Sequence, residues 1–294
     1  MKKKKKKKNS FDIVGSILIY FVALASIVPF VLLVSGSFTA ESEVVINGFS
    51  IIPKKFSLDA YKYIFKSPEK ILRGFWMSIA TTGVGTLVSV FVTAMTGYVL
   101  SRRKFLLADK IAFFLYFTTL FSGGLLPYYI LMVRYLHLKN TFLALIIPGM
   151  LPVFNILIMR NFAKEIPYEI SESAYVDGAG EFQIFMKLYL PMMKPSLATI
   201  GLLVALSYWG NWSNSMLYTD QERLYTLQYL LYRATSGLTA IAQNPDLANE
   251  AVITLPTQTV KLAMTVITVI PVAFVYPFAQ KYLVQGMTVG AVKG

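Results

Sequence analysis

Most side chains that could do chemistry lie in short segments between long apolar stretches, and one such segment carries a group of acids. In ESAYVDGAGEFQIFMKLYLP, residues 172–191, Glu172, Asp177 and Glu181 fall within ten residues. A metal centre would need carboxylates clustered with histidines or cysteines. The chain has one histidine, His137, in a distant segment, and it has no cysteine. The acids are therefore expected to contact another molecule rather than to catalyse a reaction.

A second group combines aromatic rings with amides in SYWGNWSNSMLY, residues 207–218. On one continuous helix Trp209 and Trp212 would share a face, and Asn211 and Asn214 would share the adjoining one. Aromatic faces stack on sugar rings and amides pair with hydroxyl groups. The residues predicted to line an oligosaccharide pathway are Tyr208, Trp209, Asn211, Trp212 and Asn214. The alternative is a belt of Trp and Tyr at the membrane interface.

The elements that carry these residues are expected to be membrane-spanning helices. Only 15% of the 294 residues are charged, 55% are hydrophobic, and the mean hydropathy is +0.57. Several runs without ionisable residues are close to the roughly 20 residues that a helix needs to cross a bilayer. These six runs are residues 13–40, 75–100, 111–133, 141–159, 195–219 and 262–280. The predicted fold class is an all-α polytopic membrane protein with six transmembrane helices.

The distribution of Lys and Arg predicts the side of the membrane on which each segment lies. The lysine run Lys2–Lys8 precedes the first apolar run, and such a basic tail stays on the cytoplasmic side. With the N-terminus inside, 101–110, 160–194 and 281–294 also lie inside, and together with the tail they hold most basic residues. A cleaved signal peptide also begins with a basic region, but the first apolar run is too long for one. The net charge of +13 therefore indicates anionic membrane lipids rather than nucleic acid as a partner.

The composition of the runs argues against several kinds of transporter. Ion-coupled carriers hold their coupling ion with acids, His or Arg inside the bilayer, and the six runs contain none of these. The chain also lacks the sequence G-x-x-x-x-G-K-[ST] that cradles the phosphates of ATP. If transport is active, its energy must come from a partner that contacts an inside segment. The longest inside segment, residues 160–194, contains the three acids described above.

This segment is expected to form two short helices on the inner membrane surface. Pro167 fits the first turn of a helix that breaks at Gly178 or Gly180. A second helix, residues 181–190, is expected to stop at Pro191. The residues expected to share its apolar face are Phe182, Phe185, Met186 and Tyr189. The pair is a candidate knob for a soluble partner, because the acids disfavour the alternative of a helix among anionic headgroups.

The same segment resembles the signature EAA…G…I-LP of bacterial ABC importer permeases. Glu172-Ser173-Ala174 stands for EAA, Asp177-Gly178-Ala179 for the DGA that follows, and Leu188 with Leu190-Pro191 for I-LP. Two departures, Ser for the first Ala and Leu for Ile, are conservative in size. The resemblance extends over residues 11–294. The stretches GGLLPYYILMVRYLHLKNTFLALIIP and VQGMTVGAVKG look like the maltose-permease-like carbohydrate branch, above all its lipoprotein/complex-polysaccharide permeases.

The resemblance implies the type I importer permease fold, with a lysine-rich cytoplasmic tail over 1–10 and a single transmembrane permease domain over 11–294. It implies that residues 164–191 form a coupling helix segment, which docks in an ATPase subunit and transmits nucleotide-driven closure to the spans. The residues that it assigns to coupling are Glu172, Ser173, Ala174, Asp177, Gly178, Ala179, Leu190 and Pro191. Among them Glu172 would face a basic group of the ATPase, and Gly178 would make the turn.

The resemblance also implies partners and a location. It implies a second permease subunit, two ATPase subunits and an extracytoplasmic sugar-binding lipoprotein in a bacterial plasma membrane. This chain would be neither an enzyme nor a cofactor carrier, and ATP and Mg would bind to the partner ATPase. The function expected from the resemblance is that of a permease subunit of an ATP-driven importer for oligosaccharides, such as the breakdown products of complex polysaccharides. The alternatives are an importer permease for peptides or other solutes, an autonomous channel or carrier, and a membrane-embedded enzyme, for which the spans offer no catalytic cluster. The specific substrate site could also lie in the partner permease or in the binding protein.

Overall fold

The computed structural model describes residues 10–243 and 257–291, and the elements within these ranges are helices. The one pairing of strand type among them is an isolated bridge between Thr39 and Phe56. The all-α class predicted from the sequence is therefore confirmed. The predicted lysine tail, apart from its last residue, lies outside the described residues.

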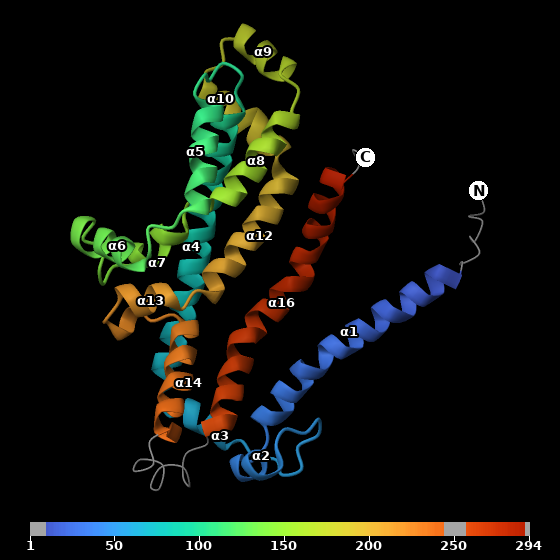
Figure 1. Cartoon of the computed structure of the whole chain (residues 1–294), viewed down its shortest axis with the longest axis vertical. Helices are drawn as coiled ribbons and strands as arrows, with labels where there is room; N and C mark the ends of the chain where they lie inside the picture. Colours follow the sequence, from blue (N-terminus) through green and yellow to red (C-terminus); the bar gives the residue numbers. More distant parts are fainter. Residues whose placement is uncertain (1–9, 244–256, 292–294) are drawn as a thin grey trace. The chain divides into compact units, whose positions relative to one another are not determined.

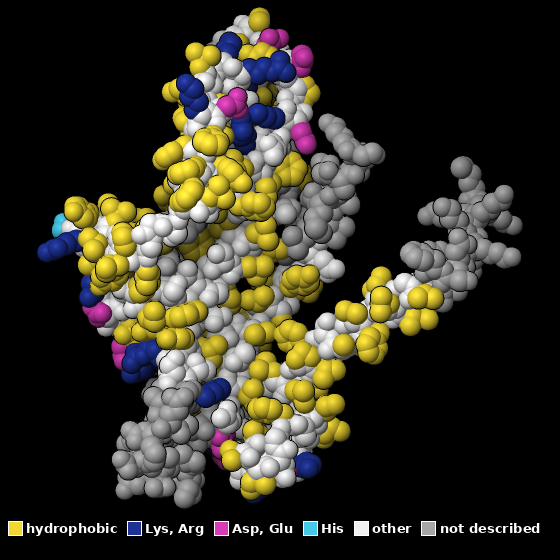
Figure 2. Space-filling model, viewed as in Figure 1, with side chains coloured by type: hydrophobic (Ala, Val, Ile, Leu, Met, Phe, Trp, Pro, Cys, Tyr) yellow, Lys and Arg dark blue, Asp and Glu magenta, His cyan; other side chains and the backbone are white. Residues whose placement is uncertain are grey.

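The chain divides into two compact units, the first of which contains residues 1–68 and 233–270. Its helices (Figure 1) are α1 (Ser10–Ser37), α2 (Glu41–Asn47), α3 (Asp59–Ile64), the later part of α14 (Leu227–Gln243) and the first part of α16 (Thr257–Ala291). Large apolar side chains are exposed along α1 (Figure 2), as in a helix that lies in lipid or against a partner. The carboxylate of Glu41 accepts the backbone N–H groups of Gln258 and Thr259, both at 2.8 Å, and so caps the N-terminus of α16.

The second unit contains residues 69–232 and 271–294. Its helices, besides the first part of α14 and the later part of α16, are α4 (Pro68–Ser101), α5 (Ala108–Leu120), α6 (Leu125–Ile130), η1 (Leu131–Tyr135), α7 (Leu143–Ile146), η2 (Ile147–Gly149), α8 (Val153–Glu165), α9 (Glu169–Val176), α10 (Glu181–Ile184), η3 (Phe185–Tyr189), α11 (Leu190–Met192), α12 (Lys194–Gly210), α13 (Ser213–Tyr218) and η4 (Glu222–Leu224). Here η1 and η3 are π-helices, and η2 and η4 are 3-10 helices. The helices α4, α5, α8 and α12 run alongside one another, with α9 and α10 at one end (Figure 1).

Three helices are long and apolar enough to cross a membrane, and they coincide with three predicted spans. They are Val14–Ser37 in α1, Pro68–Ser101 in α4 and Gln258–Pro277 in α16. Each of the other three predicted spans overlaps a pair of helical segments that meet at a bend, and the last pair begins at Glu181, within the segment predicted to lie inside. The bends are 115° between Ala108–Leu120 and Leu125–Tyr135, 56° between Leu143–Gly149 and Val153–Glu165, and 82° between Glu181–Met192 and Lys194–Trp209. With each pair counted as one span, the described residues offer at most the predicted six.

Glycine and proline explain two of these breaks. In 111–133 the first helix ends at Phe121, whose backbone is extended (φ −123°, ψ 114°), and Gly124 follows with φ +87°. Glycine adopts a positive φ at little cost, so the chain can turn sharply there. In 141–159 the break falls at Pro152, which has a fixed φ and no N–H and therefore suits the residue before a new helix. Each of these two runs is therefore a pair of helical segments that meet at a bend.

The last predicted span of this unit also ends earlier than expected. The helix α12 stops at Gly210, and Asn211 has an extended backbone (φ −80°, ψ 106°). The Asn211 side chain accepts the backbone N–H of Asn214 at 2.9 Å, so it caps α13 instead of continuing α12. Trp209 and Trp212 therefore lie on opposite sides of a helix break, and the predicted shared face does not form.

The buried face of α4 is made of small residues, which let neighbouring helices approach closely. Its buried positions include Gly74, Ser78, Thr81, Gly85, Ser89, Thr93 and Gly97. A Cβ atom at Gly97 would lie 2.9 Å from the backbone nitrogen of Arg160 and from the side chain of Met159. A Cβ atom at Gly85 would lie 2.8 Å from the ring of Tyr208. The close contacts of α4 with α8 and α12 therefore depend on glycine.

We expect Gly97→Ala to destabilise the protein by about 1–3 kcal/mol, because the added methyl group must displace the backbone of α8. Gly83→Ala is the matched control, since the same change on the same helix meets no atom within 4 Å. The control should gain up to about 1 kcal/mol, because alanine favours the helix. Thermal unfolding of both purified variants in one detergent measures the difference. Equal midpoints would show that the contact between α4 and α8 does not need glycine.

Candidate coupling site

The segment that resembles the importer signature forms the short helix α9 at one end of the second unit (Figure 1). The helix begins at Glu169 rather than at Pro167. The residues from Pro167 form a tighter turn, in which the N–H of Ile170 bonds to the Pro167 carbonyl at 3.3 Å. Glu169 and Glu172 lie in the first turn of α9, where the helix dipole favours negative charge.

A glycine cap ends this helix. Gly178 has φ +77°, and its N–H bonds to the carbonyl of Tyr175 at 3.0 Å. The N–H of Ala179 bonds to the carbonyl of Ala174 at 2.9 Å. These two bonds and the left-handed glycine form a common helix C-cap, so of the two predicted positions for the break, Gly178 and Gly180, the structure has it at Gly178. The triplet that starts at Asp177 therefore stops α9 and turns the chain toward α10.

One face of α9 packs inward and the other is exposed. Ala174 belongs to the main core cluster, Ser171 is fully buried, and Ala179 is half-buried against the same cluster. The residues of the outward face are Glu172, Ser173, Val176 and Asp177. Val176 is 88% exposed and lies beside these acids. Of the residues assigned to coupling, Glu172, Ser173 and Asp177 are thus accessible on this face, and Gly178 and Pro191 are exposed as well. Ala174 and Ala179 pack against the core of the same unit.

The second helix of the segment continues through Pro191 instead of stopping there. The chain passes from α10 through the π-helix η3 into α11 and turns only at Met193. In η3 the N–H of Leu190 bonds to the carbonyl of Phe185, five residues back. This wider turn comes directly before Pro191, which lacks an N–H and would crowd the preceding turn of an α-helix. The predicted end is therefore wrong, because the π-turn accommodates the proline.

The π-turn also divides the apolar face predicted for this helix. Phe185 and Tyr189 are buried in the core cluster together with Ile184. Phe182 is 65% exposed, and Met186 is exposed as well. A wider turn changes the register, so residues at α-helical spacing do not share one face here. Only part of the predicted face is available to a partner.

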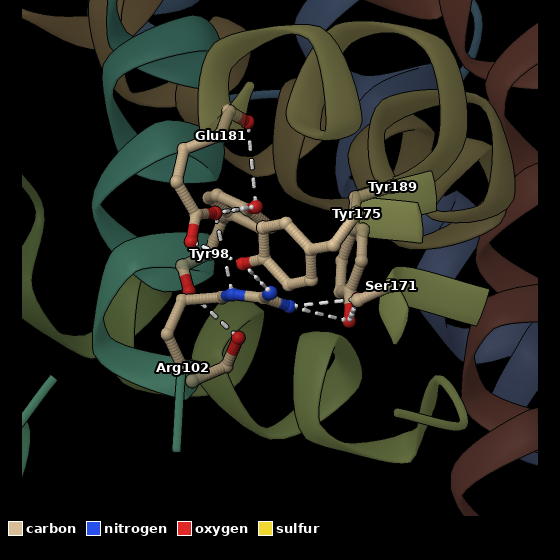
Figure 3. A network of polar contacts seen from close by, with 7 residues as sticks. Tyr98, Arg102, Ser171, Tyr175, Glu181 and Tyr189 are labelled. Atoms are coloured by element: carbon tan, nitrogen blue, oxygen red, sulfur yellow. Dashed lines mark hydrogen bonds and ion pairs between the residues drawn. The ribbon is translucent and has the colours of Figure 1, made fainter. Parts of the chain in front are cut away.

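A buried arginine at the end of α4 connects the helices of this segment (Figure 3). Arg102 is 7% exposed and directly follows the last residue of α4. Its guanidinium donates hydrogen bonds to the hydroxyl groups of Ser171 at 2.9 Å, Tyr189 at 3.0 Å and Tyr175 at 2.6 Å. Its Nε lies 3.5 Å from a carboxylate oxygen of Glu181. One side chain therefore contacts α9, η3 and α10.

Tyrosines complete the network. Tyr98 and Tyr175 both donate hydrogen bonds to the carboxylate of Glu181. The guanidinium of Arg102 lies 5.1–5.8 Å from four ring centres, a distance at which ring faces attract a cation. These rings belong to Tyr98, Tyr168, Tyr175 and Tyr189. Burial alone would raise the pKa of Glu181, but the hydrogen bonds from Tyr175 and Tyr98 and the charge of Arg102 lower this pKa below its usual value.

A second arginine, Arg160 of α8, closes the same end of the unit. Its Nε donates to the carbonyl of Leu100 at 3.0 Å, one of the last carbonyl groups of α4. Another nitrogen of the same guanidinium pairs with Asp109 at the start of α5. In Figure 2 basic and acidic side chains gather at this end, while hydrophobic side chains cover much of the flank below it. The charge pattern fits an end that leaves the membrane.

The sequence predicts for Arg102 only a place on the inner side of the membrane, and this prediction misses the network. The available signal is the pair Tyr98 and Arg102, which are four residues apart and therefore share one helix face. The other partners come from residues 171–189, and only the tertiary fold brings them to the end of α4.

The residues predicted to line a substrate pathway do not form one surface. Tyr208 is buried and donates to the carbonyl of Ile146 at 2.8 Å. Asn214 is also buried and donates to the carbonyl of Leu145 at 3.3 Å. Asn211 caps α13, as described above. These three polar groups satisfy the backbone of the fold itself.

The two tryptophans lie in different surroundings. The ring of Trp212 stacks on that of Tyr232, with centres 4.0 Å apart. Trp209 lines a cavity of about 350 Å³, whose walls come from α4, α12 and the later part of α16. This volume lies within the range of small-molecule sites, about 300–1,000 Å³. Of the predicted pathway residues, only Trp209 is at this cavity.

The chain is similar over nearly its whole length to two proteins of Bacillus subtilis (strain 168). It is 38% identical to protein LplC over 284 residues, and this matched region covers 97% of this chain and 95% of LplC. It is 37% identical over 291 residues to the polygalacturonan/rhamnogalacturonan transport system permease protein YtcP. This matched region covers 98% of this chain and 100% of YtcP.

A solved structure and a family profile agree with these similarities. The crystal structure of a bacterial ABC transporter involved in the import of the acidic polysaccharide alginate contains a similar chain. The two chains match with a TM-score of 0.79 and 28% identity, over 96% of this chain and 99% of the other. The likeness confirms the importer permease fold that the resemblance implies. Residues 5–289 match the family described as binding-protein-dependent transport system inner membrane component. The chain belongs to this family of importer permeases.

Proposed function

We propose that the chain imports oligosaccharides released from complex acidic polysaccharides, as the permease subunit of an ATP-driven importer. The relative YtcP is named for polygalacturonan and rhamnogalacturonan, and the similar solved transporter is named for alginate. Basic residues slightly outnumber acids in the segments predicted to lie outside, 41–74, 134–140 and 220–261. Such an excess favours an anionic cargo.

The observation that carries the coupling proposal is the outward face of α9. Glu172 and Asp177 are exposed on both sides of Val176, so a partner would meet two carboxylates and one apolar side chain. An ATPase subunit with a basic cleft would complement this face, and ATP and Mg would bind to that subunit. Ala174 and Ala179 pack against the core cluster. The outward face is therefore held in position when the ATPase subunit presses on it.

The network around Arg102 gives the route of transmission. Its bonds reach from the end of α4 to α9, η3 and α10, so a displacement of α9 acts on α4 as well. Leu190 and Pro191 lie in α11, which leads through Met193 into α12. The coupling segment is therefore linked to two helices of the bundle.

The remaining partners follow from the same assignment. A second permease subunit would complete the pathway, a sugar-binding lipoprotein would deliver the cargo, and two ATPase subunits would dock on the cytoplasmic side of a bacterial plasma membrane. The N-terminus would be cytoplasmic, with its lysines near anionic lipid headgroups.

Purification of the tagged chain in mild detergent, followed by mass spectrometry, tests the subunit composition. The expected complex contains a second permease, an ATPase and a sugar-binding lipoprotein. Reconstituted in liposomes, it should take up oligosaccharides of polygalacturonan, rhamnogalacturonan or alginate only with ATP. Arabino-oligosaccharides and peptides are the comparison cargoes. Uptake of peptides without sugars, or transport by this chain alone, would contradict the proposal.

A further inference from the structure

The segment that connects the first two spans, residues 38–67, lies at a membrane surface. It follows α1 and precedes α4, and both helices are long and apolar enough to cross a membrane. The two ends of the segment therefore leave the bilayer on the same side, and α2 lies directly beyond the end of α1 (Figure 1). A segment that is tethered in this way at both ends stays close to the lipid headgroups.

This segment exposes large apolar side chains along much of its length. Ile46 and Ile52 are each 77% exposed, and the ring of Phe56 is 65% exposed. Others that are more than half exposed are Phe49, Ile51 and Phe65. Large exposed apolar side chains gathered in one segment mark a contact with a partner or with a membrane. Branched aliphatic side chains suit acyl chains, whereas sugar rings prefer flat aromatic faces.

Backbone pairing gives these side chains a fixed base. The N–H of Ala40 bonds to the carbonyl of Lys55 at 2.9 Å. The N–H of Ser57 bonds to the carbonyl of Phe38, also at 2.9 Å. The ring of Phe56 stacks on that of Phe38, with centres 5.8 Å apart. The stretch after α1 and the stretch before α3 are therefore held side by side.

A polar groove lies beside the apolar side chains. It holds about 570 Å³ and is lined by residues 40–42 and 55–59 together with Lys62. Its hydroxyl groups come from Ser42 and Ser57, and its amines come from Lys55 and Lys62. The volume is within the range of small-molecule sites, about 300–1,000 Å³. The exposed ring of Phe56 belongs to the same wall, so the groove and the apolar side chains meet at this residue.

The acids of this segment are already engaged within the chain. Glu41 caps α16, as described above. Glu43 accepts a hydrogen bond from the side-chain amide of Asn47 at 2.9 Å. Asp59 accepts one from the amine of Lys62 at 3.4 Å. Glu41 and Asp59 lie in the wall of the groove, but each already has donors, so they do not leave the groove negative.

The lysines, in contrast, keep positive charge available. Within the described residues neither Lys55 nor Lys66 takes part in an ion pair, and the amine of Lys66 lies 5.6 Å from the ring centre of Tyr63. The pair of Lys62 with Asp59 is exposed on both sides, 73% and 71%, so it is weak and can exchange for another anion. Lysines beside exposed apolar residues reach headgroup phosphates while their apolar stems stay near the acyl chains.

We propose that residues 38–67 bind anionic phospholipid, with a headgroup phosphate in the groove beside Lys55 and acyl chains against Ile52 and Phe56. Lysine-rich amphipathic segments bind membranes through apolar burial and attraction to anionic lipids. Because Glu41 ties the segment to the N-terminus of α16, bound lipid also holds the start of that helix. The inference requires neither the proposed cargo nor the proposed coupling partner.

Fluorescence quenching tests whether the segment lies in lipid. The purified complex carries a fluorophore on Ile52→Cys, which is then the one cysteine of this chain, in phosphatidylcholine nanodiscs with a minor fraction of lipid brominated in its acyl chains. Equal quenching should need about fivefold less brominated phosphatidylglycerol than brominated phosphatidylcholine. Gln221→Cys is the control, because it is exposed among the charged residues of 220–223 and should not be quenched. Absence of quenching at Ile52→Cys by both lipids would overturn the proposal.

Removal of two lysine charges tests the headgroup site. In the Ile52→Cys background, Lys55→Gln combined with Lys66→Gln should make the two brominated lipids quench equally. The unfolding midpoint should stay the same, because both lysines are exposed. Lys139→Gln is the matched control, since its amine pairs with Asp220 at 2.8 Å and the preference for phosphatidylglycerol should remain. A preference that persists in the double variant would overturn the headgroup site.

The loaded binding protein is the competing partner for this surface. If it shields the fluorophore on Ile52→Cys from a water-soluble quencher while brominated lipids leave the fluorophore unquenched, the surface belongs to that protein and the lipid proposal is wrong. None of these measurements depends on uptake, so the lipid surface and the proposed function can fail separately.

Discussion

Replacement of Arg102 by alanine should reduce uptake about tenfold or more and lower the free energy of unfolding by about 3 kcal/mol. The guanidinium donates to the hydroxyl groups of Ser171, Tyr175 and Tyr189. Hydrogen bonds to a charged group contribute about 1.5–3 kcal/mol each, and they are not fully additive. The ion pair with Glu181 contributes less, about 0–1 kcal/mol, because its atoms are 3.5 Å apart and the carboxylate side chain is 53% exposed.

Because the hydrogen bonds of Arg102 contribute more than its ion pair with Glu181, substitutions at these two residues should differ in effect. Glu181→Gln keeps an acceptor for the hydroxyl group of Tyr98 and should be much milder than Arg102→Ala. Arg102→Lys keeps the charge but has no planar fork, so it should resemble the alanine variant. The matched control is Arg103→Ala, which removes the same charge from an exposed neighbour that lies over one ring, that of Tyr168.

Thermal unfolding in detergent and uptake by the reconstituted complex measure both effects. The amount of complex recovered from the membrane shows whether the variant still assembles. If Arg102→Ala and Arg103→Ala had the same midpoint and the same uptake, the network would have no part in coupling.

Replacement of Gly178 by valine should leave the complex assembled and reduce uptake about tenfold. Gly178 has φ +77°, a conformation that costs other residues roughly 1–2 kcal/mol and a β-branched residue more. The new Cβ itself would meet no neighbour, since nothing of this chain lies within 4 Å of it. Within this chain the effect would therefore come from the backbone, which must leave the cap and move the residues that end α9. ATP hydrolysis should then respond weakly to the loaded binding protein.

Gly180→Val provides the control for this experiment. Gly180 is two residues away, has equally open surroundings, and has an extended backbone (φ −76°, ψ 161°) that valine readily adopts. Its uptake and its stimulated ATP hydrolysis should stay near those of the wild type. Equal behaviour of the two variants, whether both active or both inactive, would show that the left-handed cap is not what positions α9.

The sequence predicts the location of the spans better than their shape. Runs without ionisable residues give the apolar segments, because burying a charge in lipid is costly everywhere along the chain. Bends depend on single glycine and proline residues, and not every such residue bends the helix in which it lies. Gly124 and Pro152 coincide with breaks, whereas Pro271 and Pro277 lie inside the continuous helix α16. Whether a proline breaks or merely perturbs a helix depends on neighbours that satisfy the freed carbonyl, and these are set by the fold.

The candidate site also has features that the sequence predicts and features that it does not predict. The break at Gly178 is predictable, since a left-handed cap needs glycine and the residues around it are local. The partners of Arg102 are not predictable, because they approach from residues 171–189 across the fold. For Asn211 and Asn214 the sequence likewise leaves two roles open. An amide has the same composition whether it binds cargo or caps a helix, and only the position of the carbonyl or N–H group beside it distinguishes the two.

The π-helix before Pro191 has a consequence for how this segment tolerates change. A π-turn holds one residue more than an α-helical turn, so loss of one residue there would restore an α-helical turn while the helix on either side keeps nearly the same phase. The wider turn before Pro191 would then be lost, and the proline would crowd the preceding turn. Tyr189, which lies inside the π-turn, would also shift relative to Arg102. Substitutions within Phe185–Tyr189 affect single contacts, but a deletion removes the turn itself. The segment is therefore expected to vary in residue type far more freely than in length.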